Sequence, residues 1–174
     1  MAESFDVKIR KTAFEDLEAI NNILNHAIAN TNAYLSSKQK TIKDTEDWFE
    51  EHNLPDGYFS LSCEYEGSVI GWACISSFRS IEGFAPTAEV SVYVDLAYRG
   101  RGIAGKLMEA LIQEAQKRNF HNLISFITVD NETSIFLHQK HGFEVQGTLK
   151  EVAIKNGQYQ DVVVMAKLLS KLSL

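Results

Sequence analysis

A short glycine-rich run between a strand-like segment and a long helical pattern constrains the fold of this chain more than any other feature. Residues 98–106 read Tyr-Arg-Gly-Arg-Gly-Ile-Ala-Gly-Lys, after the strand-like segment Glu89–Val94 and at the start of the helical pattern Gly102–Arg118. Glycine lets the main chain approach a ligand closely, and the first turn of a helix leaves several N–H groups without intrahelical partners. These donors and the helix dipole favour a phosphate group. Positive charge is added by Arg99, Arg101 and Lys106. The sequence therefore predicts a strand–loop–helix unit that binds a pyrophosphate-bearing molecule.

The same glycines allow a second interpretation, a dinucleotide-binding fold. Gly100, Gly102 and Gly105 match G-x-G-x-x-G, and Asp130 follows the next strand-like run, where a ribose-binding acid is expected. However, the motif lies in the middle of the chain, and Asp95–Arg99 separate the strand from the first glycine. Only one further strand–helix step follows, whereas a doubly wound sheet needs more. The dinucleotide is therefore the weakest alternative.

Length, charge and cysteine content limit the class of protein. A chain of 174 residues is expected to form one domain over residues 1–174. Its net charge of −6 argues against a general nucleic-acid binder, which needs a basic surplus. Cys63 and Cys74 lack metal-ligand spacing, so we expect buried free thiols and no metal. Acids among Met1–Asp6 and the lack of a long apolar run predict no leader, no membrane span and a cytoplasmic location.

Hydrophobic periodicity predicts a mixture of strands and helices that do not strictly alternate. Strands are expected at Val7–Arg10, Phe59–Tyr65, Val69–Ser77, Thr87–Val94, Leu123–Val129, Phe143–Ile154 and Asp161–Leu168. Helices are expected at Phe14–Ala29, Asp44–His52, Gly102–Arg118 and Asn131–Lys140. Thr12 and Glu15 form a capping-box pattern before the first helix. The order β-α-α-β-β-β-α-β-α-β-β predicts an α+β fold with a mostly antiparallel sheet.

The glycine loop also fits another template. Arg99, Gly102 and Ala104 occupy the defined positions of Q/R-x-x-G-x-G/A, so the loop resembles the coenzyme A pyrophosphate loop of the GNAT superfamily of acetyltransferases. Asn131, Ser134 and a helix that ends in Gly142-Phe143 resemble a second motif of that superfamily. The element order is similar over nearly the whole chain, which implies a single-domain GNAT-like fold with a mixed, mostly antiparallel sheet flanked by helices.

The resemblance implies acetyl-CoA as the cosubstrate. It implies that the strand before the loop splays from the next strand and contacts the pantetheine arm through its main chain. The residues assigned to the coenzyme are Val92, Tyr93, Val94, Arg99, Gly100, Arg101, Gly102, Ile103, Ala104, Gly105, Asn131 and Ser134.

Further matches resemble the phosphinothricin and methionine sulfoximine N-acetyltransferase branch of the superfamily. Glu-Val-Ser-Val-Tyr-Val at Glu89–Val94 is similar to its Val-Glu-His-Ser-Val-Tyr-Val, and Phe78-Arg79 matches a Phe-Arg or Trp-Arg pair. Val90 stands where that branch usually has His, and Tyr159 where it usually has Trp. Since these departures lie near the expected acceptor pocket, the acceptor stays open.

The branch implies direct transfer of an acetyl group to the primary amine of a small amino-acid-like acceptor. Glu89 is the candidate base that deprotonates the amine, and a main-chain N–H of Val92 or Val94 is the candidate oxyanion donor. His138 is either an acid/base partner of Glu89 or the donor that protonates the departing thiolate. Arg79 is expected to bind an acceptor carboxylate. The acceptor pocket is expected to be bordered by Phe78, Glu82, Gly83 and Phe84.

Three rival functions remain at this point: acetylation of a protein N-terminus, acetylation of a polyamine, and coenzyme A binding without turnover. Arg79 argues against a polyamine, whose site should hold several acids, and Glu89 with His138 argues against a binding module without turnover. The resemblance also implies a homodimer.

Overall fold

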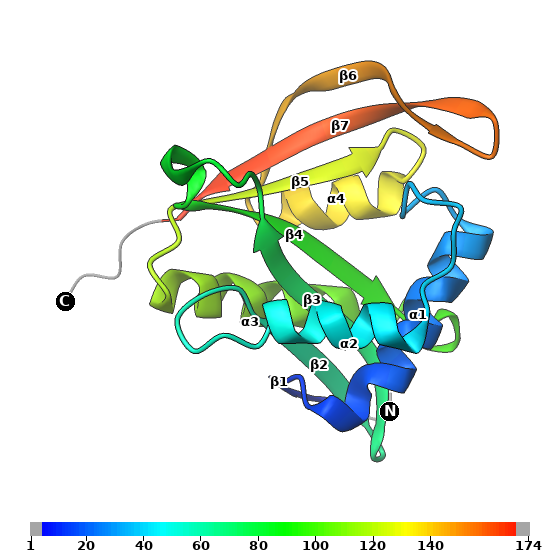
Figure 1. Ribbon diagram of the computed structural model, residues 1–174, viewed down its shortest axis with the longest axis vertical. Helices are drawn as coiled ribbons and strands as arrows, with labels where there is room; N and C mark the ends of the chain where they lie inside the picture. The colour runs from blue at the N-terminus through cyan, green and yellow to red at the C-terminus, as the bar shows by residue number, and fades with distance from the viewer. Residues whose placement is uncertain (1–4, 170–174) are drawn as a thin grey trace.

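Seven strands form one mixed sheet in the computed structural model, which describes residues 5–169 (Figure 1). Their order across the sheet is β1-β2-β3-β4-β5-β7-β6, and every neighbouring pair is antiparallel except β4 and β5. Their bounds are β1 Lys8–Lys11, β2 Ser60–Tyr65, β3 Ser68–Ser77, β4 Thr87–Val94, β5 Asn122–Thr128, β6 Glu144–Lys155 and β7 Gln158–Leu168. The predicted mostly antiparallel α+β sheet is confirmed. Residues 1–4, on which the expected lack of a leader partly depends, lie outside the described residues.

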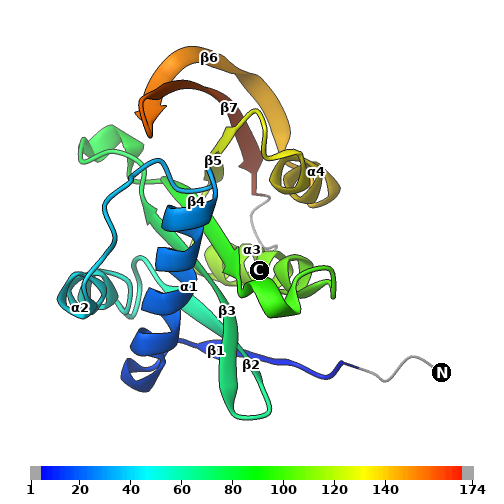
Figure 2. The same ribbon diagram turned by 90° about the vertical axis from the view of Figure 1, so that its right-hand side faces the viewer.

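Helices cover both faces of this sheet (Figure 2). α1 (Leu17–Asn30) and α2 (Ile42–Glu51) lie on one face, and α3 (Ile103–Lys117) and α4 (Glu132–Lys140) lie on the other. The apolar face of α3 is buried against the sheet, with Leu107, Met108 and Leu111 fully enclosed. Within residues 5–169, none of the helices has the length and apolar content needed to cross a membrane.

The predicted capping box at Thr12 and Glu15 is wrong by one residue. The Asp16 carboxylate accepts the Ala13 main-chain N–H at 2.8 Å, and a 3₁₀ turn precedes α1. Thr12 instead accepts a hydrogen bond from Ser62 at 3.1 Å. Asp16 takes the capping role because Arg10 holds its carboxylate with two bonds of 2.7 and 2.8 Å. A long-range ion pair thus overrides the local capping pattern.

The parallel pair β4 and β5 separates after three residues. Pairing runs from Thr87 with Asn122 to Glu89 with Ile124, while β4 continues to Val94 and β5 to Thr128. The other edge of β4 stays paired with β3 as far as Val94 and Gly71. β4 therefore has an edge without a strand partner beyond Glu89, and the two strands diverge from that point (Figure 1).

Candidate active site

The open edge of β4 presents main-chain N–H groups to the gap between β4 and β5. The Asp95 N–H donates to the Ile70 carbonyl at 2.9 Å, so Asp95 bonds on the β3 side. Main-chain groups alternate between the two edges of a strand, and the register of β3 and β4 is unbroken. The N–H groups of Val94 and Val92 therefore face the gap, where the resemblance assigns them to the coenzyme. The Val94 carbonyl accepts from Arg99 Nε at 3.2 Å, which ties the loop back to the strand.

The gap leads to the N-terminus of α3. Gly102 is the N-cap residue, with φ 77°, and Gly100 has the same positive φ, which L side chains rarely adopt. The Gly102 carbonyl accepts the Lys106 N–H at 3.2 Å, which is the first main-chain bond of the helix. The N–H groups of Ile103, Ala104 and Gly105 precede this bond and lie in the first turn, where a helix leaves its donors for a ligand.

Three cations surround this helix N-terminus, and none of them is in an ion pair among the residues that the structure describes. Arg101 stacks over the Phe5 ring, with 4.8 Å from Cζ to the centroid, and Lys106 Nζ donates to the Phe5 carbonyl at 3.5 Å. Together with Arg99 these residues leave positive charge without an acidic protein partner. Such a site suits an anionic ligand such as a pyrophosphate.

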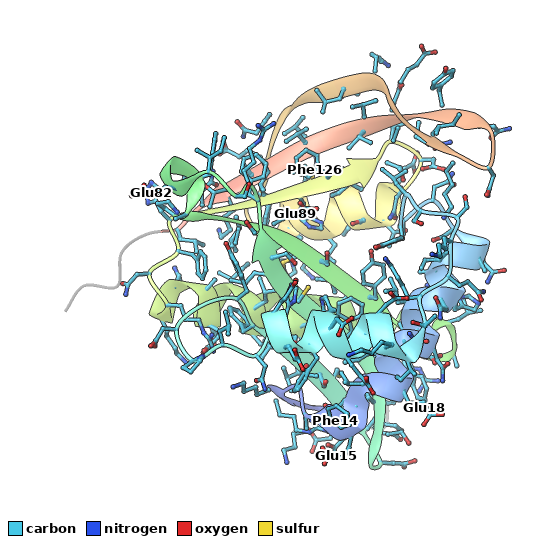
Figure 3. The ribbon with its side chains drawn as sticks, viewed as in Figure 1. Phe14, Glu15, Glu18, Glu82, Glu89 and Phe126 are labelled. Carbon is cyan, nitrogen blue, oxygen red and sulfur yellow. The ribbon has the colours of Figure 1, made fainter. Side chains whose placement is uncertain are left out.

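Glu89 is half-buried on β4 at the point where β4 and β5 diverge (Figure 3). Strand alternation separates it from Ala88 and Val90, which belong to the core under α3, so its carboxylate lies on the opposite face of the sheet. Burial raises the pKa of the Glu89 carboxyl. No hydrogen bond or ion pair of its carboxylate is found in the described part of the chain. A carboxylate with a raised pKa and no protein partner is suited to general base chemistry.

An aromatic cluster lies beside Glu89 on this face. Phe78 stacks on Phe126 of β5 at 6.2 Å between centroids and contacts Phe84 edge-on at 5.5 Å. Arg79 is exposed, with its guanidinium 5.8 Å from the centroid of Phe84, and it joins no ion pair within residues 5–169. The 3₁₀ turn Glu82–Phe84 lies on the surface and carries Gly83. Figure 3 shows Glu82, Glu89 and Phe126 around this end of the gap.

His138 is buried in α4 and is not brought together with Glu89. It is 5% exposed and packs edge-on against Phe143, which belongs to the core cluster on the α3 side of the sheet. Glu89 lies on the opposite face, and no interaction between the two is found among the described residues. The predicted acid/base couple therefore lacks its contact.

The hydrogen bonds of His138 fix its tautomer. Nδ1 lies 2.7 Å from the Ser134 carbonyl, which can only accept, so Nδ1 carries the proton of the neutral ring. Nε2 is then an acceptor, and it is buried without a partner in the described structure. Burial also lowers the pKa of His138. Protonation of a thiolate by His138 would require the imidazolium form, which this burial disfavours.

Asn131 caps α4. Its Oδ1 accepts the Ser134 N–H at 3.2 Å, which satisfies one of the free donors of the first turn of the helix. The Asn131 amide nitrogen is not used by this bond and remains available to a ligand.

Sequence reasoning missed two parts of this site. Phe126 of β5 lies on the same face of the sheet as Glu89 of β4 and is 38% exposed. The sequence around it is typical of an ordinary strand and does not mark it as part of a site. Lys155 opens a Lys-Asn-Gly turn, a pattern typical of exposed residues, yet its side chain is buried against the loop after α1. Only a three-dimensional arrangement brings such distant residues together.

A divergent strand pair beside a cationic, glycine-bounded helix N-terminus is the arrangement expected of a coenzyme A-dependent acyltransferase. A family model described as "Acetyltransferase (GNAT) family" matches residues 21–143, and the chain belongs to this family. The protein is therefore an N-acetyltransferase of the GNAT type. The predicted superfamily and enzyme class are confirmed.

Proteins similar to this chain over most of its length carry more than one acetyltransferase name. An L-methionine sulfoximine/L-methionine sulfone acetyltransferase of Salmonella typhimurium is 36% identical over 150 residues, which cover 86% of this chain and 87% of that protein. A crystal structure of a ribosomal-protein-alanine N-acetyltransferase from Brucella melitensis is 41% identical with a TM-score of 0.90, and the match covers 93% of this chain and 99% of that one.

An acetyltransferase from Salmonella typhimurium, solved with its cofactor acetyl-CoA, is 34% identical with a TM-score of 0.92 and 97% of both chains covered. The predicted resemblance to the methionine sulfoximine and phosphinothricin branch, and acetyl-CoA as the cosubstrate of such proteins, are confirmed by these relatives.

Proposed function

We propose that this protein transfers the acetyl group of acetyl-CoA to the α-amine of a small amino-acid-like acceptor. The observation that carries this proposal is the position of Glu89 at the last residue pair before β4 and β5 diverge. A base at this place lies beside the main-chain edge along which the thioester is expected to run. The acceptor amine and the acetyl carbonyl can then meet next to one carboxylate.

The coenzyme is held by main chain and by positive charge. The pyrophosphate is bound by the first-turn N–H groups of Ile103, Ala104 and Gly105, with Arg99 and Arg101 beside it. The pantetheine arm follows the open edge of β4. His138 Nε2 is a buried acceptor without a partner, and it supports this placement because a pantetheine amide N–H is a suitable donor.

The reaction is direct attack of the neutral amine on the thioester carbonyl. Glu89 takes the proton from the attacking nitrogen, and its raised pKa brings it closer to the pH at which the enzyme works. The negative charge on the carbonyl oxygen is stabilised by the Val92 or Val94 N–H, which faces the gap. The C–S bond then breaks, the amide is released, and the coenzyme leaves as its thiol after taking up one proton. The neutral tautomer of His138 is a hydrogen-bond acceptor in this scheme and not the proton donor.

The acceptor is an amino acid or a close analogue. Arg79 has no acidic partner in the described structure, so its guanidinium can bind the acceptor carboxylate with two bonds. Phe78, Phe84 and Phe126 form an apolar wall for the acceptor side chain. Relatives named for methionine sulfoximine, for L-amino acids and for phosphinothricin support this acceptor class.

A second acceptor class is supported by one observation. The solved structure with 41% identity is named as a ribosomal-protein-alanine N-acetyltransferase. A protein N-terminus has no carboxylate beside its amine, so it makes no use of Arg79. The free amino acid is therefore the preferred acceptor.

The protein is further proposed to act in the cytoplasm as a homodimer of single-domain chains. Cys63 and Cys74 are both free and buried, which suits a reducing compartment. Apolar residues exposed on β6 support a subunit contact; they are Val145, Leu149, Val152 and Ile154.

A screen of amines tests the acceptor class. Release of coenzyme A thiol is measured with acetyl-CoA and amino acids, amino-acid analogues, polyamines or alanine-starting peptides. Amino acids and their analogues are expected to react fastest, and Arg79→Ala should slow them far more than it slows a peptide. Faster reaction with peptides than with any free amino acid would reverse the choice of acceptor, and no thiol release with any amine would contradict the proposal.

A further inference from the structure

The Lys155 ammonium is enclosed by main-chain carbonyls far from it in sequence. Lys155 is the last residue of β6 and is 3% exposed. Its Nζ donates to the Ile28 carbonyl at 2.9 Å, to the Tyr34 carbonyl at 2.7 Å and to the Thr31 carbonyl. An ammonium has three N–H donors, and all three are used here. Burial lowers the pKa of Lys155, and the three acceptors offset the loss of hydration.

These carbonyls belong to the end of α1 and to the loop that follows it, residues 31–34, which we name the α1 loop. The last carbonyls of a helix lack intrahelical partners and carry partial negative charge. Lys155 therefore caps α1 and holds the α1 loop at the same time. Ser37, further along, donates to Asn156 Oδ1 at 2.8 Å, so the β6–β7 turn holds this segment at a second point.

The α1 loop crosses the wide end of the gap between β4 and β5. On the β4 side, the Tyr93 hydroxyl donates to the Ala33 carbonyl at 3.4 Å. On the β5 side, the Thr128 hydroxyl donates to the Asn32 carbonyl at 3.4 Å, and Asn32 Nδ2 donates to Asp130 at 2.7 Å. Figures 1 and 2 both show the chain after α1 running beside the turn after β5.

The loop lies on the same face of the sheet as the candidate base. Tyr93 is four residues beyond Glu89 on β4, and Thr128 is four residues beyond Ile124, the partner of Glu89 on β5. Side chains an even number of residues apart share a strand face. The α1 loop is therefore the wall of the gap opposite the aromatic cluster of Phe78, Phe84 and Phe126.

We propose that Lys155 is a positioning residue for acetyl transfer, which fixes the α1 loop and thereby the place of the acceptor amine relative to Glu89. This inference rests on the proposed function. Lys155 does not touch the acceptor, since its three donors are bound to main chain. Without it, the α1 loop loses two hydrogen bonds and the end of α1 loses a third, together with the charge that holds them, while the coenzyme site at α3 keeps all its contacts.

The test compares Lys155→Met with Lys150→Met. Lys150 lies on the same strand, but it is exposed and pairs with Asp161 at 2.7 Å, away from the α1 loop. With the fastest amino acid of the amine screen, Lys155→Met should raise the KM for the acceptor roughly tenfold, as misplacement remote from the chemistry does. The Kd for acetyl-CoA, from titration calorimetry, should stay within about twofold, because the α3 contacts are intact. Lys150→Met should change neither value.

A second variant covers the case in which Lys155→Met does not fold. Asn32→Ala removes only the bond to Asp130 at one end of the α1 loop, and it should raise the acceptor KM in the same direction by a smaller factor. Hydrogen exchange of residues 31–36 should be faster in both variants, with the first turn of α3 unchanged.

The outcomes separate the two proposals. If the wild-type protein is active and both loop variants keep the wild-type acceptor KM, the positioning role is wrong while the proposed function stands. An equal loss of acetyl-CoA affinity and acceptor binding in Lys155→Met would also contradict it, because this indicates a general structural role. A wild-type protein that releases no thiol with any amine overturns the proposed function and this inference with it.

Discussion

The two ends of the candidate site are built differently. The proposed coenzyme end is mostly one continuous stretch, Val92–Gly105, in which main-chain N–H groups lie beside the exposed cations Arg99 and Arg101. The proposed acceptor end is made of side chains from separate segments: Arg79 after β3, Glu89 on β4, Phe126 on β5 and the α1 loop held by Lys155. One end depends on local backbone conformation, and the other depends on how distant segments pack.

This difference determines how each end tolerates substitution. Main-chain donors survive the exchange of most side chains, so the coenzyme end should be sensitive chiefly where glycine sets the backbone. At the proposed acceptor end the side chains themselves are assigned the chemistry, so single substitutions there should have the largest effects.

The largest effect is expected for Glu89→Gln at the acceptor end. Loss of a general base should lower kcat/KM for the amine by about 10²–10⁴-fold, whereas the Kd for acetyl-CoA should hardly change. Thiol release and titration calorimetry measure the two quantities. Glu18→Gln, an exposed acid in the first turn of α1 and away from Glu89 (Figure 3), is the matched control and should retain most of the activity.

The pH dependence of Glu89→Gln sharpens the same test. A base must be deprotonated, so kcat/KM of the wild type should rise as pH passes through the raised pKa of Glu89, and this rise should be absent from the variant. The raised pKa means that Glu89 binds its proton more tightly in the folded state than in the unfolded state. The contribution of protonated Glu89 to the free energy of unfolding is therefore lost as pH rises through its folded pKa. Glu89→Gln should therefore be at least as stable as the wild type at pH 7.5. An unchanged pH–rate profile would remove Glu89 from the role of base.

A smaller effect is expected at His138, which is buried in α4. His138→Phe removes the unpartnered Nε2 acceptor and should lower kcat about tenfold, the equivalent of one hydrogen bond. Burial lowers the pKa of His138, so the unfolded state binds its proton more readily, and the wild type should lose stability as pH falls below about 6.5.

His52 is a second buried histidine, and it differs from His138 in the pairing of its ring nitrogens. It is also buried with a lowered pKa, but both of its ring nitrogens are paired, with the Trp48 carbonyl and the Ser76 hydroxyl, each at 2.7 Å. Melting curves at pH 5 and pH 7.5 should show a smaller acid-induced loss of stability in His138→Phe than in the wild type.

A fall in kcat of a thousandfold in His138→Phe, as large as that expected at Glu89, would show that His138 transfers a proton.

The contrast between the two ends also explains what the sequence could predict. The glycine loop, the helix that follows it and the order of strands and helices are local patterns, and the structure contains all of them. The α1 loop contact of Lys155, the wall formed by Phe126 and the separation of His138 from Glu89 depend on pairings between segments far apart in the chain. Even the capping box failed for this reason, because Arg10 and Ser62 decide which acid caps the helix.

At the coenzyme end, Gly102→Ala tests whether backbone conformation matters more than side chains. Gly102 has φ 77° with open space around an added Cβ, so the cost is backbone strain of about 1–2 kcal/mol. Gly67, in a turn away from the site, has φ 79° and the same open surroundings.

Both alanine variants, Gly102→Ala and Gly67→Ala, should lose similar stability in chemical unfolding. Only Gly102→Ala should weaken acetyl-CoA binding, by roughly fivefold, as expected when first-turn donors are slightly displaced. Equal acetyl-CoA affinity in the two variants would contradict the assignment of the pyrophosphate to this turn.

The smallest effect is expected for Arg101→Ala. Its guanidinium is exposed and stacked on Phe5, so an interaction with a phosphate there is weakened by solvent and salt. Acetyl-CoA affinity should fall only about two- to fivefold, and the difference from the wild type should shrink as salt is raised from about 50 mM to about 500 mM. Lys117→Ala, at the opposite end of α3, is the control and should leave the affinity unchanged at every salt concentration. A loss greater than that of Gly102→Ala would mean that side-chain charge, rather than the main chain of the loop, dominates coenzyme binding, and the contrast between the two ends would no longer hold.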